Sequence, residues 1–332
     1  MATNNNNKAL NVPHLRFPEF TGEWEKCKVS DLLDFYSTNS LSWEQLEYDT
    51  NTVMNLHYGL IHVGLPTMVD LAKDKLPNIK KENMPKNFEL CKEGDVAFAD
   101  ASEDTNEVAK TIEFYTLARE NIVCGLHTIH GRDNKNKTVV GFKGYAFSSA
   151  AFHNQIRRIA QGTKIYSIST KNFSECYIGL PSKPEQTKIA TLLRLIDERI
   201  STQNKIIEKL QSLIKGLAAQ LTQSGTPNIR LCDCLECHSS TLQENCVSVT
   251  GSYPVYGATG LIGYTNNYAY NGESILIVKD GSGVGSLSYV NDHFSVIGTL
   301  NYLTAKENYS ILYLYYALMA FNFTPYITGM AI

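Results

Sequence analysis

Two short stretches of the sequence contain residue types that can bind a metal or a phosphate. CDCLECH, at residues 232–238, spaces three thiols as C-x-C-x2-C with His238 beside the third. Thiolate and imidazole are zinc ligands, but no second pair at finger-like spacing follows. KDGSGVG, at residues 279–285, has glycines that let backbone N–H groups approach a phosphate closely. Strand-like runs on both sides favour a hairpin turn over a nucleotide-binding loop.

Histidines and carboxylates could also indicate acid–base catalysis. His57, His62, His127 and His130 precede or follow the acidic run ADASEDTNE at residues 99–107. Spacing alone does not assemble a nucleophile, a base and an orienting group from them. We therefore assign no catalytic residue, no metal ligand and no cofactor. A nuclease or a nucleotide-dependent enzyme acting on DNA is the alternative from another class.

Basic residues gather in one window, and this pattern favours contact with DNA. Residues 132–171 hold eight lysines and arginines against one acid, although the whole chain has a net charge of −3. Phosphate neutralisation supplies much of DNA-binding affinity, and arginine can also read guanine through two hydrogen bonds. The predicted contacts in this window are Arg132, Lys135, Lys137, Lys143, Arg157, Arg158, Lys164 and Lys171. A solvated basic face, or a docking face for a partner subunit, is the alternative.

The C-terminal third of the chain has a different surface chemistry. Residues 228–332 hold three basic residues against seven acids, and 12 of the 19 tyrosines. The predicted DNA contacts in this region are Lys279, Tyr253, Tyr256 and Tyr264.

Length and composition indicate a globular protein with two domains. The chain has 332 residues, of which 43% are apolar and 19% are charged, enough for two hydrophobic cores. No window approaches the roughly 18 uninterrupted apolar residues of a membrane span. We therefore expect a cytoplasmic protein with reduced cysteines, in which residues 1–12 form a solvated tail.

Residues 181–225 are predicted to form one long helix that positions the two domains. Ser182 and Glu185 are spaced as a capping box at its start, and Gly225 and Pro227 mark its end. Steps of four and three give a coiled-coil seam in which nine of ten residues are apolar. The seam residues, predicted to pair with another helix, are Ile189, Leu193, Ile196, Ile200, Gln203, Ile207, Leu210, Ile214, Leu217 and Leu221. The alternative is a long helix packed on its own domain.

The segments on either side of this helix share landmarks in the same order, which indicates an internal repeat. KVSDLLDF (28–35) matches RLCDCLEC (230–237), and GDVAFADAS (94–102) matches GESILIVKD (272–280). IVCGLHTIHGRDN (122–134) matches SVIGTLNYLTAKEN (295–308), and IAQGTKI (159–165) matches YITGMAI (326–332). Short runs of Val, Ile, Phe and Tyr, together with short helices near 146–160 and 310–322, predict an α+β fold. We expect domains at 13–180 and 226–332, the second a shorter copy that lacks the last strand region.

The sequence resembles the DNA-specificity subunit of type I restriction-modification systems over nearly its whole length. The resemblance is carried by LRFPEFTGEWEKCKVSDL, NLHYGLIH, ELCKEGDVAFADASEDTNEVAK, GLHTIHGR, AQGTKIYSIS and LPSKPEQTKIATLLRLIDERI in the first part, and by YPVYGATGLIGYTN, ILIVKDGSGVG and SVIGTLNYL in the second. It implies two target recognition domains held apart by a helix, each reading half of a split site in double-stranded DNA.

The resemblance also implies partners and an absence of chemistry in the subunit itself. Members of this family dock two methyltransferase subunits, which use S-adenosylmethionine, and restriction subunits with motor and nuclease activity. The family pattern has a second helix region after the second domain, which is missing from this sequence. The seam is therefore expected to pair with another copy or another polypeptide, and a scaffold fragment that only dimerises is a second alternative.

Overall fold

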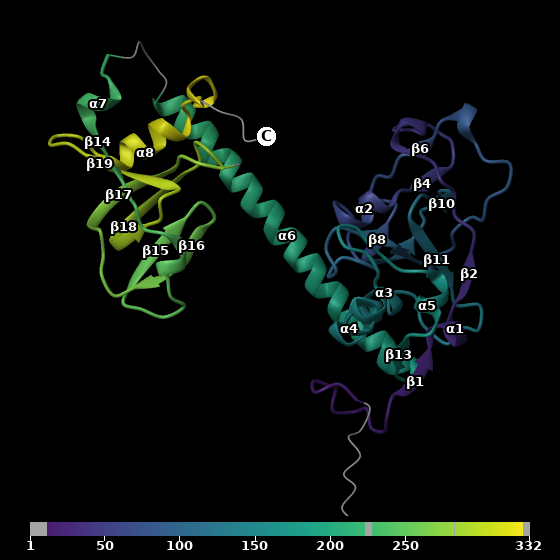
Figure 1. The fold of residues 1–332 in the computed structure, drawn as a ribbon. Helices are drawn as coiled ribbons and strands as arrows, with labels where there is room; N and C mark the ends of the chain where they lie inside the picture. Colours follow the sequence, from purple (N-terminus) through teal and green to yellow (C-terminus); the bar gives the residue numbers. More distant parts are fainter. Residues whose placement is uncertain (1–11, 223–227, 282, 328–332) are drawn as a thin grey trace, which may run out of the picture. The chain divides into compact units, whose positions relative to one another are not determined.

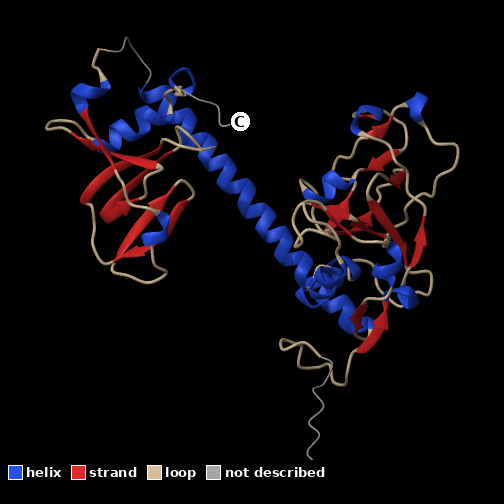
Figure 2. Ribbon diagram, viewed as in Figure 1, coloured by secondary structure: helices blue, strands red, loops and turns tan. Residues whose placement is uncertain are grey.

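The structure is a computed structural model that describes residues 12–222, 228–281 and 283–327. The chain divides between Ser201 and Thr202 into two compact units, and each unit combines helices with β-sheet (Figure 2). The predicted α+β fold is confirmed. Among the described residues, no helix is both long and apolar enough to cross a membrane.

The first unit is built on a five-stranded sheet with the order β2–β11–β7–β9–β5. Its neighbours are antiparallel except for β5 and β9, which run parallel. The strands are β2 (Asp34–Tyr36), β11 (Thr128–Arg132), β7 (Val96–Ala99), β9 (Thr111–Thr116) and β5 (Met68–Asp70). β7 and β11 are buried along their whole length, which is why they read as continuous runs rather than as alternating ones.

A second sheet and two short strand pairs complete the β-structure of this unit. The second sheet has the order β10–β4–β6–β3, and the pairs are β1–β13 and β12–β8. Their bounds are β10 (Ile122–Cys124), β4 (Met54–Leu56), β6 (Asn78–Ile79), β3 (Leu46–Glu47), β1 (Glu25–Lys28), β13 (Tyr177–Leu180), β12 (Tyr166–Ser167) and β8 (Ala101–Ser102).

Short helices cover the five-stranded sheet. They are α1 (Val29–Leu32), α2 (Tyr58–His62), α3 (Lys143–Phe147), α4 (Ala150–Ile159) and α5 (Thr170–Ser174), with the 3-10 turns η1 (Trp43–Gln45) and η2 (Lys81–Asn83). The side chain of Ser149 accepts a hydrogen bond from the amide of Phe152 and begins α4, as an N-cap serine does. Phe98, Phe147, Phe152 and Phe173 join these helices to β7 in one fully buried aromatic cluster.

The second unit has a six-stranded sheet with the order β14–β19–β17–β18–β15–β16. The strands are β14 (Leu235–Ser239), β19 (Leu300–Ala305), β17 (Tyr270–Val278), β18 (Leu287–Val296), β15 (Tyr253–Gly257) and β16 (Gly260–Thr265). The helices are α7 (Leu231–Cys234) and α8 (Ile311–Met319), with the 3-10 turns η3 (Glu244–Cys246) and η4 (Thr324–Tyr326). Ser310 caps α8 through the amide of Tyr313, as Ser149 caps α4.

The strand order of the second sheet repeats that of the first, strand by strand. β14, β19, β17, β18 and β15 take the places of β2, β11, β7, β9 and β5. The single parallel neighbour recurs as well, since β15 runs parallel to β18. Chance similarity would not reproduce both the order and the one parallel pair, so the predicted internal repeat is confirmed. In the last matched pair, residues 328–332 lie outside the described ranges.

One ring contact recurs in the two units with its residue types exchanged. Tyr36 on β2 pairs with His130 on β11 with 5.3 Å between ring centroids. At the matching position, His238 on β14 stacks on Tyr302 of β19 at 4.7 Å. The repeat therefore preserves the shape of this contact rather than the residue types.

The long helix is continuous. α6 (Lys183–Thr222) has 40 residues and is therefore about 60 Å long. Figure 1 shows it as one unbroken helix. Its predicted beginning after Ser182 is confirmed, whereas the predicted stop signals Gly225 and Pro227 lie outside the described residues. The seam is exposed from Ile196 onward: Ile200 and Leu210 are 54% and 52% exposed. Only Ile189 and Leu193, at its beginning, are half-buried.

The carboxylate of Glu185 does not form the predicted capping box. It accepts two hydrogen bonds from Arg16, at 2.7 and 2.8 Å, and one from the indole of Trp24 at 3.1 Å. This long-range contact attaches the N-terminal segment to the first turn of α6. A residue more than 160 positions away thus takes the place of the local backbone donor.

Acid should release this N-terminal attachment. The hydrogen bonds from Arg16 lower the pKa of Glu185 against the opposing effect of burial. A carboxyl group whose pKa is depressed by folding stabilises the fold above its unfolded pKa of about 4.3, and the stabilisation is lost as the pH falls through the folded value. In a Trp43→Phe background, the fluorescence of Trp24 should therefore change below about pH 4.

The matched variants are Glu185→Gln and Glu208→Gln, the second on an exposed part of α6. Glu185→Gln should show the released Trp24 signal already at pH 7, while Glu208→Gln should titrate like the parent. An acid transition that persists unchanged in Glu185→Gln would contradict this assignment.

Candidate nucleic-acid interface

Arg132 is buried and is not available to DNA, contrary to the sequence-based prediction. Pairing of β11 with β7 places its guanidinium beside Asp95, which it contacts through Nη2 at 2.8 Å, while Nη1 reaches Glu89 at 2.6 Å. The ring of Tyr36 covers the guanidinium at 4.3 Å. Arg132 is the last residue of β11 and holds the sheet together.

Asp95 is shared between Arg132 and His130. His130 Nε2 lies 2.7 Å from Asp95 Oδ2 inside the sheet. Burial raises the pKa of Asp95, but the hydrogen bonds from His130 and Arg132 outweigh it, so the pKa falls below its usual value. Burial lowers the pKa of His130, but the hydrogen bond to Asp95 and the neighbouring Cys91 outweigh this and raise it to about 9. The network is internally compensated and offers no free charge to a ligand.

Lys143 is also buried, at 3% exposure, so its predicted contact with DNA is wrong for the same reason. Its ammonium lies 3.2 Å from Glu113 on β9 and 3.0 Å from the hydroxyl of Thr138. Lys135 and Lys137 are on the surface but engaged, Lys135 with the carbonyl of Asp31 and Lys137 with the carboxylate of Glu25.

The remaining predicted cations lie on one continuous stretch, residues 157–171, which we call the basic segment. Arg157 and Arg158 are in the last turn of α4, Lys164 is in the connection that follows, and Lys171 is the second residue of α5. All four side chains are exposed. Within the described chain, Arg158, Lys164 and Lys171 form no ion pair, and Arg157 contacts only the amide oxygen of Asn154. A bridge between Gln161 and Ser167 folds the segment back on itself.

The fold also assembles a group of histidines and aromatic rings that the spacing of these residues did not predict. Tyr58 is at its centre, with ring centroids 4.8 Å from His57, 5.8 Å from His62 and 5.2 Å from His127. Trp43 also contacts His57, with 4.5 Å between ring centroids and the two rings tilted by 33°. We call these five residues the histidine–aromatic cluster. Burial, with His127 adding to it, lowers the pKa of His57.

Acidic and basic side chains surround this cluster. His127 contacts Asp100 at 3.1 Å, and Lys110 contacts Glu107 at 2.7 Å. Next to them is a cavity of about 560 Å³ lined by Tyr58, His62, Ser102, Glu103, Asp104, Glu107 and Lys110. The surface thus presents hydrogen-bond donors and acceptors, the groups that read base edges. The motif NLHYGLIH supplies three of the five cluster residues and was the available sequence signal.

The basic segment and the histidine–aromatic cluster adjoin each other. β12, which follows Lys164, pairs with β8, with Tyr166 opposite Ser102 and Ser167 opposite Ala101. The carbonyl of Ala101 contacts His62 Nε2 at 2.9 Å, and the amide of Ile168 donates to Asp100. One surface of the first unit therefore combines unpaired cations with base-sized rings.

In the second unit, the predicted contacts Tyr253, Tyr256 and Tyr264 are all half-buried. Tyr256 is half-buried against Phe294, and Tyr264 is half-buried on β16. Tyr253, Tyr268 and His293 instead form a group with ring centroids 4.7–5.8 Å apart. Of these, only Tyr253 was among the predicted contacts.

KDGSGVG forms a hairpin loop between β17 and β18, as its flanks predicted. The amide of Gly285 donates to the carbonyl of Val278 and closes the loop. Gly281 and Gly285 have φ angles of 92° and 87°, which glycine adopts without strain. Lys279 at its start is exposed and forms no ion pair within the described residues.

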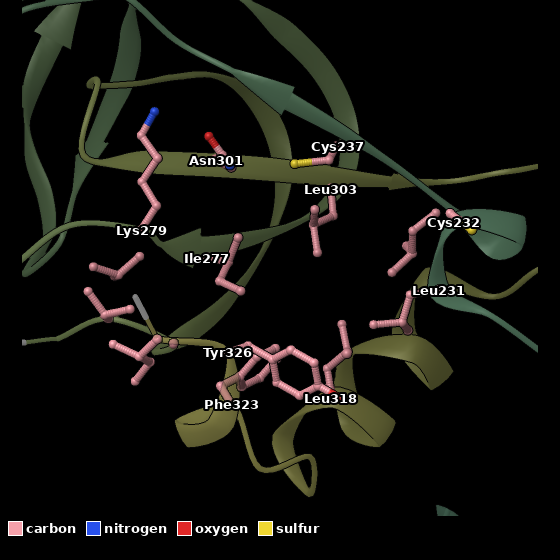
Figure 3. A pocket seen from close by; sticks show the side chains of 15 residues that line it. Leu231, Cys232, Cys237, Ile277, Lys279, Asn301, Leu303, Leu318, Phe323 and Tyr326 are labelled. Carbon is pink, nitrogen blue, oxygen red and sulfur yellow. The ribbon is translucent and has the colours of Figure 1, made fainter. Parts of the chain in front are cut away.

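The cysteines of CDCLECH do not face one another. Cys234 is buried with its thiol directed at the carbonyls of Arg230 and Leu231, while Cys232 contacts Asp233. Cys232 and Cys237 line an apolar cavity of about 540 Å³. Figure 3 shows Leu318, Phe323 and Tyr326 facing Ile277 and Leu303 across it. In the first unit, the counterpart of α7 is α1. There the segment that joins α5 to β13 contacts α1, because the amide of Val29 donates to the carbonyl of Cys176.

A family model described as the type I restriction modification DNA specificity domain matches residues 74–212 and 229–332. The chain belongs to this family. Each of the two matched stretches covers most of one sheet, so the specificity domain occurs twice, in agreement with the repeat. The resemblance stated from the sequence is thereby confirmed.

Relatives and a solved structure agree with this assignment. A Haemophilus influenzae protein with the provisional name type I restriction enzyme specificity subunit S.HindORF215P is 29% identical over 89 residues, 26% of this chain and 23% of that protein. The Methanocaldococcus jannaschii protein provisionally named type I restriction enzyme MjaX specificity subunit is 25% identical over 220 residues, 66% of this chain and 50% of that protein. The chain thus spans half or less of the length of these relatives.

The structural comparison shows the fold. The crystal structure of a type I restriction-modification system S subunit from M. genitalium superimposes with a TM-score of 0.59 at 18% identity, covering 92% of this chain and 78% of that one. Specificity-domain architecture, with two related units and a long helix, is therefore shared with a solved S subunit.

Proposed function

We propose that this chain reads a two-part site in double-stranded DNA, one part with each specificity domain. The carrying observation is the repeat: two sheets with the same strand order follow one another along a chain that includes an uninterrupted 40-residue helix. Two similar readers joined by a helix suit two half-sites at a set separation. The basic segment supports phosphate contact in the first unit, and Lys279 with the Tyr253 group supports it in the second.

The chain is proposed to act without chemistry of its own. The family assignment supports a specificity role beside two methyltransferase subunits that use S-adenosylmethionine, and beside restriction subunits. Of the carboxylates that an alternative nuclease would use, Asp100 contacts His127 and Glu107 contacts Lys110. A purified chain should therefore turn over neither nucleotide nor DNA in the presence of Mg²⁺.

Selection from a random duplex library tests the two-part site. The full chain, with the methyltransferase partner added in a parallel arm, is expected to enrich two blocks of defined bases separated by a constant gap of undefined bases. Enrichment of a single block, or none, would reject the two-part reading. DNA cleavage or nucleotide hydrolysis by the chain alone would support the enzyme alternative instead.

The seam of α6 is proposed to pair with a second helix. Ile196, Ile200, Ile207, Leu210, Ile214 and Leu217 are each 43% or more exposed, and such an apolar stripe gains by burial. Ile200→Glu with Leu210→Glu should therefore reduce the sedimenting mass of a self-associated chain to that of one copy. Lys205→Glu with Ser212→Glu, on the opposite face of α6, is the matched control. A mass that Ile200→Glu with Leu210→Glu leaves unchanged would reject self-association through the seam.

A further inference from the structure

Three metal-ligating side chains from separate segments meet inside the first unit. Cys91 lies before β7, Cys124 ends β10 and His130 is in the middle of β11. One ligand atom of each lies within 4.8 Å of the other two, and all three residues are buried. The two thiols are free and their sulfurs are 3.6 Å apart. No short sequence spacing joins these three residues, so spacing alone does not predict the group.

One ring nitrogen of His130 is hydrogen-bonded, and the other has no partner among the described residues. Nε2 contacts Asp95 at 2.7 Å. Nδ1 is buried and has no hydrogen-bond partner in the described part of the chain, and His130 itself is 0% exposed. A buried hydrogen-bonding group left without a partner destabilises the folded state. A carboxylate on one ring nitrogen with the other directed at a metal is the usual arrangement for a metal-bound histidine.

We propose that Cys91, Cys124 and His130 bind one zinc ion, with Asp95 orienting the histidine. Two sulfurs at about 2.3 Å from a tetrahedral zinc ion lie roughly 3.8 Å apart, close to the 3.6 Å between these thiols. Two thiolates and one imidazole form a donor set for zinc rather than for magnesium or calcium. The two thiolates also neutralise the ion, which permits burial. Zinc takes the place of the thiol and ring protons, and a non-protein ligand completes four-coordination.

The position of the group gives such an ion a structural role. Cys124 belongs to the four-stranded sheet and His130 to the five-stranded sheet, while Cys91 donates its amide to Ile122 of β10. A bound ion would connect both sheets of the first unit close to the Asp95–Arg132 network. This site is independent of the proposed DNA reading, because its three ligands are buried. None of them belongs to the basic segment or to the histidine–aromatic cluster.

Cobalt and zinc titrations of the full chain test the proposal. The background variant carries Cys232→Ser, Cys237→Ser and Cys246→Ser, which removes the exposed thiols. After reduction and chelator treatment, it should bind one Co²⁺ per chain with a near-ultraviolet thiolate-to-cobalt band, and Zn²⁺ should abolish the band. Cys124→Ser and, separately, His130→Gln should lose one-to-one binding, and Asp95→Asn should weaken it about 10–100-fold.

Loss of metal binding can be distinguished from a folding defect. Both tryptophans, Trp24 and Trp43, are in the first unit, so their fluorescence reports whether each variant has folded. Zinc should raise the unfolding temperature of the background variant and not that of folded Cys124→Ser. The proposal is overturned if the background variant binds no cobalt, if folded Cys124→Ser binds it equally, or if the mass shows a Cys91–Cys124 disulfide.

Discussion

Replacing Glu113 by alanine should lower the free energy of unfolding of the first unit by about 3–5 kcal/mol. Glu113 is fully buried, with Lys143 at 3.2 Å and the amides of Gly141 and Gly144 donating to its two oxygens at 2.9 and 2.8 Å. Its loss leaves a buried ammonium without a counter-charge and two amides without an acceptor. Tryptophan fluorescence during urea unfolding measures the effect, because neither tryptophan is in the second unit.

A double variant distinguishes the destabilisation caused by an unpaired buried lysine from the net contribution of the Glu113–Lys143 pair to stability. Burial raises the pKa of Glu113 although Lys143 and the two glycine amides oppose it, so burying this charge is itself unfavourable. Glu113→Gln with Lys143→Met removes both charges, keeps one side-chain acceptor and should recover most of the lost stability. Glu208→Ala, on the exposed part of α6, should be within about 0.5 kcal/mol of the parent. A Glu113→Ala variant as stable as this control would show that the pair is not needed.

Replacing Arg158, Lys164 and Lys171 together by alanine should weaken DNA binding at least about 100-fold at low salt. Charge-assisted hydrogen bonds contribute about 1.5–3 kcal/mol each, and 1.4 kcal/mol is a factor of ten. Each phosphate contact that is lost should also reduce the slope of log affinity against log salt by about one. Fluorescence anisotropy with a selected duplex, at several salt concentrations, measures both quantities.

The matched control is Lys81→Ala, Lys86→Ala and Lys92→Ala. These three cations are also exposed, belong to the same unit and change the net charge equally. Figure 1 shows α4 near α6 and β6, which precedes Lys81, at the other end of the unit. If the control loses as much affinity as the test variant, binding follows overall charge and the basic segment is not the contact surface.

Features of the fold that depend on local pattern could be predicted from the sequence. The start of α6 and the hairpin at Gly281 each depend on residues within one or two turns. The repeat was visible because its landmarks occur in the same order in both halves. These features need no knowledge of which strands are neighbours.

Features that depend on strand pairing could not be predicted. Arg132 reads as an exposed loop cation until β11 lies beside β7 and Asp95 is its neighbour. The same holds for Lys143 with Glu113, and for Glu185, whose partners are Arg16 and Trp24 rather than a local amide. The histidine–aromatic cluster needs Tyr58 and His127 to meet from segments about 70 residues apart. A basic window in a sequence therefore indicates charge, whereas pairing decides which charges remain at the surface.

The exposed middle of α6 has a consequence for backbone dynamics. Between Leu195 and Leu217 the apolar side chains face solvent, so only hydrogen bonds within the helix protect its amides there. Most helical stability in proteins comes from packing of an apolar face, so opening of this unpacked stretch should cost far less than global unfolding. Deuterium uptake should accordingly be fast across these residues in the free chain and slow sharply once a partner helix covers them, which makes this stretch an internal reporter of assembly.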